Sequence, residues 1–194
     1  MELLVPDLAE GDFAGLTVTG QLAVVDRLAA AAVDPGLKPG TSAERVAGVT
    51  LIGSSLGGYL AALYAARHAA EVNRVILLAP AFRLAERWLE REGAQKIAEW
   101  ERAGSLPYFH YGEKREIHLK WEFLADARRY ESYPDFAQQA LIFHGEADDV
   151  VPLEGSVEFV GRHPRARLQV MASDHELGNC LDAMWQQTKA FLAL

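Results

Sequence analysis

The chain has 194 residues, of which 50% are hydrophobic and 24% are charged, and its formal net charge is -8 at pH 7. This length fits one domain with a substantial buried core, and the composition excludes a disordered chain. The acidic balance argues against a nucleic-acid partner, because binding to phosphates needs clustered lysine and arginine.

The sequence has no apolar run long enough to cross a membrane, and its first residues lack the basic stretch of a signal peptide. We therefore expect a cytoplasmic protein without a membrane partner. The single cysteine, Cys180, has no second cysteine to pair with, which suits a reducing compartment and a role as a small apolar side chain.

Short apolar runs predict five buried strands, at residues 3–5, 46–52, 74–78, 140–143 and, more weakly, 167–171. Continuous apolar runs are typical of a parallel sheet that helices cover on both faces. Helical patterns alternate with the strands at residues 19–32, 58–68, 156–162 and 180–192. We predict one α/β domain over residues 1–194, with a mostly parallel sheet of about five strands flanked by helices. Residues 34–45, with their turn-forming Pro and Gly, are expected to form a surface loop.

The stretch between Pro80 and Pro134 breaks this alternation. Residues 83–101 predict a helix with a solvated, salt-bridged face, residues 108–119 a hairpin, and residues 120–130 another helix. We predict that this block, at about residues 81–134, is an insertion that forms a cap over the strand ends. Its aromatic side chains are candidates for lining a pocket, although most should pack the cap onto the body: Trp88, Trp100, Tyr108, Phe109, Tyr111 and Trp121.

The segment VTLIGSSLGG at residues 49–58 is an apolar strand followed by G-x-S-x-G, centred on Ser55, and then by a helix. A serine hydroxyl is a poor nucleophile at neutral pH, so it must be held exposed beside a base. A sharp strand-to-helix turn does this, and Gly53 and Gly57 are expected to leave room for neighbouring backbone. The helix N-terminus after the serine favours an oxyanion.

Two later loops carry candidate partners for this serine. The segment HGEADDVVP at residues 144–152 ends a strand and bears Asp148 and Asp149, of which only one can face an imidazole, because adjacent side chains of an extended loop point opposite ways. His175, in SDHEL, is the one histidine of six that follows the last predicted strand. The chain order Ser, Asp, His is that of the α/β-hydrolases rather than of the chymotrypsin or subtilisin types.

The segments GSSLGG, HGEADDVVP and DHEL resemble the α/β-hydrolase superfamily, and in particular the small bacterial esterase-like group that includes the YqiA-type hydrolases. The resemblance runs through nearly the whole chain. It implies that Ser55 is the nucleophile, Asp148 the acid and His175 the base. It further implies that the amide of Leu56 is one oxyanion donor, that no cofactor takes part, and that a small-molecule carboxylic ester or thioester is cleaved through an acyl-enzyme.

The sequence departs from this family in one respect. Family members have further strands, one of which ends in a His-Gly-type loop that supplies the second oxyanion donor, and nothing before Leu56 resembles that loop. We therefore expect a shortened chain, a late start or an incomplete oxyanion hole. Residues 3–5 and 46–52 would then pair directly or leave an exposed sheet edge that favours homodimers. The alternative to an enzyme is a catalytically weak or inactive hydrolase-like protein that acts in binding or as a scaffold.

Metal and phosphate chemistry have weaker support. His110 and His118 lie on opposite arms of the predicted hairpin, without the carboxylate spacing of a zinc site. The glycine run at residues 53–58 lacks the lysine of a phosphate-binding loop. We expect no metal site.

Overall fold

The computed structural model describes residues 3–33, 48–110 and 114–194. The chain divides into two compact units, the first made of Met1–Leu28 and Leu84–Ser132 and the second of Ala29–Arg83 and Tyr133–Leu194. The surface loop predicted at residues 34–45 and the turn of the predicted hairpin lie outside the described residues.

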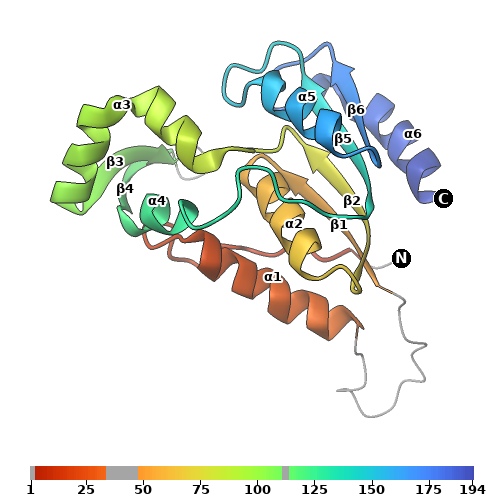
Figure 1. The fold of residues 1–194 in the computed structure, drawn as a ribbon, viewed down its shortest axis with the longest axis horizontal. Helices are drawn as coiled ribbons and strands as arrows, with labels where there is room; N and C mark the ends of the chain where they lie inside the picture. Colours follow the sequence, from red (N-terminus) through yellow and green to blue (C-terminus); the bar gives the residue numbers. More distant parts are fainter. Residues whose placement is uncertain (1–2, 34–47, 111–113) are drawn as a thin grey trace. The chain divides into compact units, whose positions relative to one another are not determined.

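The second unit is built on a four-stranded parallel sheet with the strand order β1-β2-β5-β6 (Figure 1). Its strands are β1 (Val49–Ser54), β2 (Val72–Leu78), β5 (Gln139–Gly145) and β6 (Ala166–Met171). Every residue of β5 after the first is buried, because this strand has a neighbour on each side and helices on both faces. The parallel sheet and four of the predicted strands are confirmed.

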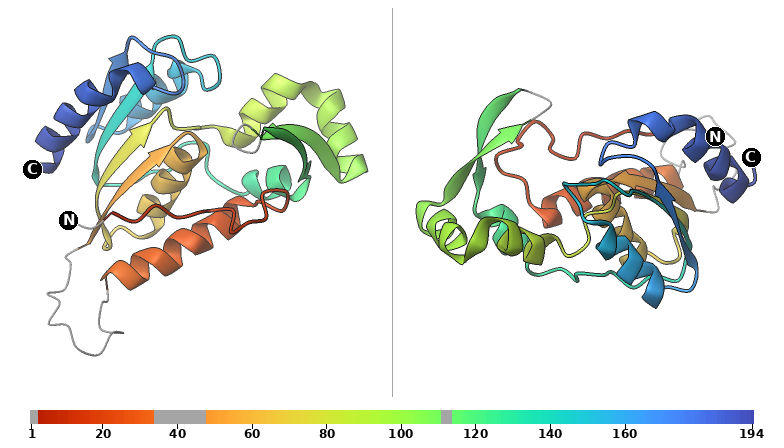
Figure 2. Two further views of the ribbon diagram at one scale, coloured as in Figure 1. Left: turned by 180° about the vertical axis from the view of Figure 1, so that it is seen from behind. Right: turned by 90° about the horizontal axis from the view of Figure 1, so that it is seen from above.

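Helices cover both faces of this sheet. The helices α2 (Leu56–Arg67) and α5 (Leu153–Arg162) lie on one face, and α6 (Leu181–Leu192) lies on the other (Figure 2). Small residues along α2 leave most of the helix buried, because they let it approach the strands closely. On the opposite face α6 completes a core cluster that draws on β2, β5, β6 and the loop after β6: Ile76, Leu141, Phe143, Met171, Leu177 and Met184. Cys180 packs beside this cluster, as expected of a small apolar side chain.

The strand predicted at residues 3–5 is wrong. These residues form neither helix nor strand, and Leu3, Leu4 and Val5 are 71%, 53% and 84% exposed. An apolar triplet becomes a strand only where a neighbouring strand accepts its hydrogen bonds. Among the described residues β1 pairs with β2 alone and therefore forms a sheet edge, so the direct pairing considered for residues 3–5 and 46–52 is also wrong.

The first unit contains the helices and hairpin that the sequence predicts within residues 84–132. They are α3 (Leu84–Ala103), β3 (Ser105–His110), the antiparallel β4 (Arg115–Lys120) and α4 (Glu122–Ala127). The unit also holds most of α1 (Val18–Val33), which confirms the helix predicted at residues 19–32. Thr19 binds Asp126 on α4 through both its N–H and its hydroxyl, at 2.7 Å each.

The aromatic side chains of this unit pack against one another. The Trp88 ring lies 5.1 Å from Trp100 and 5.8 Å from Tyr108, and Trp121 lies 5.7 Å from Trp100, measured between ring centroids. Trp100 is fully buried, and its indole N–H donates to Leu119 O at 3.0 Å. Trp100 therefore belongs to the core of this unit. The place of the unit over the strand ends, as a cap, stays a prediction.

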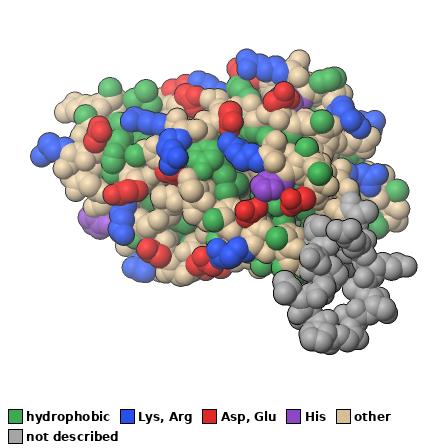
Figure 3. All heavy atoms as spheres, turned by 60° about the horizontal axis from the view of Figure 1, so that its bottom comes forward, with side chains coloured by type: hydrophobic (Ala, Val, Ile, Leu, Met, Phe, Trp, Pro, Cys, Tyr) green, Lys and Arg blue, Asp and Glu red, His purple; other side chains and the backbone are tan. Residues whose placement is uncertain are grey.

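Charges of both signs are mixed on the surface. On the face drawn in Figure 3, acidic and basic side chains are interspersed and form no single basic stripe. Of the helices in the described part of the chain, none combines the length and apolar character needed to cross a membrane.

Candidate active site

Ser55 lies at a sharp turn between β1 and α2. Its backbone adopts φ 51° and ψ -118°, a strained conformation for a residue with a side chain. The turn is held by β2 and the loop after it, because Ser55 N–H donates to Leu78 O at 2.8 Å and Ser55 O accepts from Ala81 N–H at 3.0 Å. This is the strand-to-helix turn that the G-x-S-x-G motif predicts.

The two glycines of the motif have different roles. A Cβ on Gly53 would lie 2.2 Å from Gly57 O, so only glycine fits where the start of α2 crosses the end of β1. A Cβ on Gly57 would meet no atom within 4 Å. The expectation that both glycines admit neighbouring backbone is therefore confirmed for Gly53 and wrong for Gly57.

Asp148 lies in the loop that follows β5, and its side chain is fully buried. Oδ1 accepts the N–H groups of Val150 at 2.9 Å and of Val151 at 2.7 Å. Oδ2 lies 2.8 Å from Nδ1 of His175. The neighbouring Asp149 is exposed, so the predicted contact of Asp148 rather than Asp149 with His175 is present.

His175 lies in the loop that follows β6, with its side chain 20% exposed. Because a carboxylate can only accept, Nδ1 carries the hydrogen of the bond to Asp148, and Nε2 is left as the basic nitrogen. This is the tautomer that a general base for a serine hydroxyl requires. Asn179 ties the loop back on itself, accepting from Ser173 Oγ and donating to Ala172 O.

Backbone packing brings the acid loop and the histidine loop together at Gly145. A Cβ on Gly145 would lie 2.2 Å from Asp174 O and 2.5 Å from Ser173 O. The N–H groups of Glu146 and Ala147 donate to Met171 O and Ser173 O, at 2.9 Å and 3.0 Å. The contact between Asp148 and His175 therefore rests on a close approach that only glycine allows.

Ser55, Asp148 and His175 all follow the C-terminal ends of parallel strands in one sheet, which is the edge where open α/β sheets bind ligands. The structure joins Asp148 to His175 directly. Within the described residues no hydrogen bond links the Ser55 hydroxyl to His175. Such bonds are often long in enzymes without substrate and tighten when it binds.

The amide of Leu56 is the first of α2. The first N–H groups of a helix have no partner within it and point out of its N-terminus, beside Ser55. An oxyanion formed on a carbonyl that Ser55 attacks would face this end of α2, where the helix dipole is positive.

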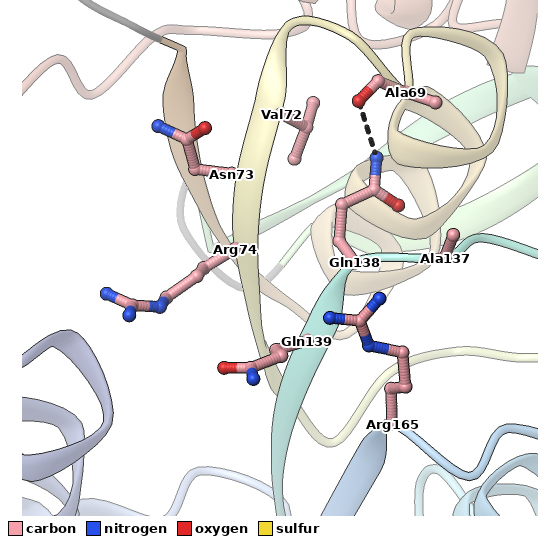
Figure 4. A pocket seen from close by; sticks show the side chains of 8 residues that line it. All are labelled: Ala69, Val72, Asn73, Arg74, Ala137, Gln138, Gln139 and Arg165. Atoms are coloured by element: carbon pink, nitrogen blue, oxygen red, sulfur yellow. Dashed lines mark hydrogen bonds between the residues drawn. The ribbon is translucent and has the colours of Figure 1, made fainter.

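A cavity of about 590 Å³ lies at the opposite ends of the strands (Figure 4). Its lining is largely polar and includes Asn73, Arg74, Gln138, Gln139 and Arg165. These residues stand at or just before the N-terminal ends of β2, β5 and β6, whereas the three predicted side chains follow the C-terminal ends. This cavity is therefore not part of the candidate site. In the parts of the chain that the structure describes, no group of three or more His, Cys, Asp or Glu is placed to hold a metal ion.

Comparison with known proteins shows the family to which the chain belongs. The sequence matches the family described as uncharacterised protein family UPF0227 over residues 28–193. No curated protein matches it.

Solved structures share the fold. A putative hydrolase from Agrobacterium vitis has a TM-score of 0.72 at 22% identity, over 93% of this chain and 70% of that chain. The mouse α/β hydrolase domain-containing protein 10 has a TM-score of 0.72 at 20% identity, over 94% and 72%. A monoacylglycerol lipase from Paleococcus ferrophilus has a TM-score of 0.67 at 15% identity, over 94% and 77%. At these identities the likeness shows the fold, which is that of the α/β-hydrolases.

Proposed function

Because the chain belongs to the UPF0227 family and has the α/β-hydrolase fold, we propose that it is a serine hydrolase that cleaves a carboxylic ester or thioester through an acyl-enzyme on Ser55. The observation that carries the proposal is the 2.8 Å bond between the buried Asp148 and His175 Nδ1, at the same sheet edge as the strained Ser55 turn. A strained turn, a buried acid and an oriented imidazole are the parts that this reaction needs.

In the proposed reaction Ser55 Oγ attacks the carbonyl carbon of the substrate while His175 Nε2 accepts the hydroxyl proton. The bond from that carbon to the leaving oxygen or sulfur then breaks, and the proton passes from Nε2 to the leaving group. In the second half water attacks the acyl carbon while Nε2 accepts its proton. The bond from that carbon to Ser55 Oγ then breaks, the carboxylic acid leaves, and Nε2 returns the proton to Ser55 Oγ. Asp148 stabilises the imidazolium that forms in each half.

The proposed oxyanion donor is the N–H of Leu56 at the start of α2. A single donor holds the developing negative charge less well than two, and loss of one donor typically costs about a hundredfold to a thousandfold in turnover. We therefore propose that turnover depends strongly on whether another N–H group supplies a second donor.

Substrate choice is assigned to the first unit, the predicted cap. In a serine hydrolase the residues that bind the acyl chain are not the residues that carry out the reaction. The proposed reaction therefore determines which bond is cleaved, but it does not determine which substituents that bond carries. We propose an ester or thioester of small to medium size, processed in the cytoplasm.

A panel of ester and thioester substrates of increasing acyl length tests the proposal. Wild-type protein should hydrolyse at least one member, and Ser55→Ala should lower kcat by about a thousandfold or more while far-UV circular dichroism stays unchanged. The Ser54→Ala variant is the matched control, because Ser54 ends β1 beside the turn and has no proposed role.

The rival proposal is a hydrolase-like binding or scaffold protein that lacks a complete oxyanion hole. A binding protein would retain an ester without cleaving it, and Ser55→Ala would bind it equally well in calorimetry. Turnover that survives in Ser55→Ala would contradict the assignment of the nucleophile.

A further inference from the structure

A second histidine, His144, lies beside the acid and has no part in the reaction as proposed. It is the last residue but one of β5, and its side chain is fully buried. Its Nδ1 lies 2.8 Å from Ser156 Oγ on α5. Its Nε2 lies 2.8 Å from Val151 O and 3.2 Å from Asp148 Oδ2. Because both ring nitrogens have partners, the imidazole is held in one orientation.

These partners decide which ring nitrogen of His144 carries the proton. A carbonyl oxygen and a carboxylate oxygen can only accept, so Nε2 carries the hydrogen and donates it to Val151 O. Nδ1 is then the acceptor, and the Ser156 hydroxyl donates to it. The positive end of the Nε2–H dipole therefore lies beside Asp148 Oδ2.

The same contacts close the acid loop into a ring. Val151 is bound through both of its backbone groups, since its N–H donates to Asp148 Oδ1 at 2.7 Å and its carbonyl accepts from His144. Backbone N–H groups of the acid loop thus bind Oδ1, and Oδ2 lies between the imidazoles of His144 and His175. A buried carboxylate is costly unless its oxygens have donors, and here loop N–H groups donate to Oδ1 and His175 donates to Oδ2.

We propose that His144 is a positioning residue, which closes the acid loop through Val151 and holds Asp148 so that Oδ2 faces Nδ1 of His175. This inference rests on the proposed function, because it gives His144 a task only if Asp148 orients the catalytic base. His144 touches no reacting atom and acts through Asp148. Its loss should therefore lower kcat and leave KM unchanged.

Two amide substitutions separate the two nitrogens of the ring. In His144→Gln the side-chain amide reaches the place of Nε2 and still donates towards Val151 O. In His144→Asn the shorter amide reaches only the place of Nδ1, so it keeps Ser156 and loses Val151 and Asp148. We expect His144→Asn to lower kcat by about tenfold to a hundredfold, as is typical when a group that orients a functional side chain is removed. We expect His144→Gln to stay within about threefold of wild type.

Ser156→Ala is the matched control, because it removes the hydrogen bond at Nδ1 and leaves the Nε2 side intact. It should lower the thermal stability and leave kcat within about twofold of wild type. Loss of kcat in Ser156→Ala as large as in His144→Asn would show that His144 serves only to anchor β5 to α5, and would overturn the proposal.

Nuclear magnetic resonance gives a readout that does not depend on activity. In wild-type protein labelled with ¹⁵N-histidine, His144 should carry its proton on Nε2, and the His175 Nδ1 proton should give a low-field signal from its bond to Asp148. That signal should weaken in His144→Asn and persist in His144→Gln.

A wild-type His144 protonated on Nδ1, or a His175 signal that is unchanged in a folded His144→Asn, would overturn the inference whether or not the protein turns over esters. If instead the wild-type spectra show the predicted His144 and His175 protons and no ester is cleaved, the proposed function fails while the positioning of Asp148 by His144 stands.

Discussion

Asp148 and Asp149 are neighbours of the same residue type, and their surroundings separate their roles. The Asp148 side chain is fully buried with donors on both oxygens, whereas Asp149 is exposed. The adjacent residues of this loop point opposite ways, as the sequence predicts from backbone geometry alone. One carboxylate can therefore orient His175 while the other remains in solvent.

Asparagine substitutions at these two positions test the assignment. Asp148→Asn keeps the shape and loses the charge that stabilises the His175 imidazolium, so kcat should fall on the order of a thousandfold or more. Asp149→Asn should stay within about threefold of wild type, because exposed charges interact weakly. Initial rates on the best ester of the panel measure both. Equal losses in the two variants would contradict the assignment.

Tyr133 carries a titration that is independent of catalysis. Burial, and then the hydrogen bond from its hydroxyl to Glu158 at 2.7 Å, raises the pKa of Tyr133 from 10.0 to about 12. The folded state therefore keeps this proton after the unfolded state has lost it. The stability that Tyr133 contributes is complete below pH 10 and is lost as the pH rises towards about 12.

Thermal melts between pH 9 and about 12 measure this linkage. The wild-type Tm should fall more steeply with pH than that of Tyr133→Phe, which has no proton to lose. Glu158→Gln should shift the tyrosine absorbance titration to lower pH, because it removes a negative charge beside the phenol. A wild-type slope no steeper than that of Tyr133→Phe would show that Tyr133 titrates as in the unfolded chain.

At the scale of elements, the site depends on the packing of two loops at Gly145. Asp174 O and Ser173 O occupy the space where a side chain at this position would begin. The acid loop and the histidine loop are therefore aligned by backbone contact before any side chain is considered.

Gly145→Ala should force these loops apart. Overpacking of this kind typically costs about 1–3 kcal/mol, and it should lower ester turnover too, because Asp174 precedes His175. Gly161→Ala on α5 is the matched control. Its Cβ would meet nothing within 4 Å, and alanine in a helix gains up to about 1 kcal/mol over glycine. Urea unfolding and ester hydrolysis measure both variants. Equal free energies of unfolding for the two would contradict the close-approach argument.

The strands show where prediction from sequence succeeds and where it fails. Runs such as residues 140–143 were predictable as strands because burial on both faces leaves a continuous apolar signal. Residues 3–5 carry a similar signal and form no strand, because pairing depends on a neighbour that a local pattern does not report. Ser55, Asp148 and His175 were predictable as candidates because each stands in a short local motif.

Gly145 and His144 were not predicted as parts of the site. Their roles arise from contacts with the histidine loop and with α5, which fold against β5 from later in the chain. The one available signal was the His-Gly pair that ends the strand before the acid. Their position directly before the predicted acid loop makes both residues candidates for the site.

In the fold of the molecule, the three proposed catalytic residues all lie in the second unit. The parallel sheet brings the ends of β1, β5 and β6 to one edge, so residues far apart in sequence meet there. Residues 84–132 have their own aromatic core and belong with residues 1–28 in a separate unit. We therefore expect substitutions within the first unit to leave the bond between Asp148 and His175 intact.

The claim that Ser55 is an activated nucleophile is tested most directly with a fluorophosphonate probe, followed by mass mapping of the labelled peptide. We predict one adduct per chain, on Ser55, and none in Ser55→Ala. Labelling should also slow greatly in Asp148→Asn, because the base loses its orienting partner. A folded wild-type protein that takes up no probe, or an adduct that persists in Ser55→Ala, would contradict the assignment of Ser55 as an activated nucleophile.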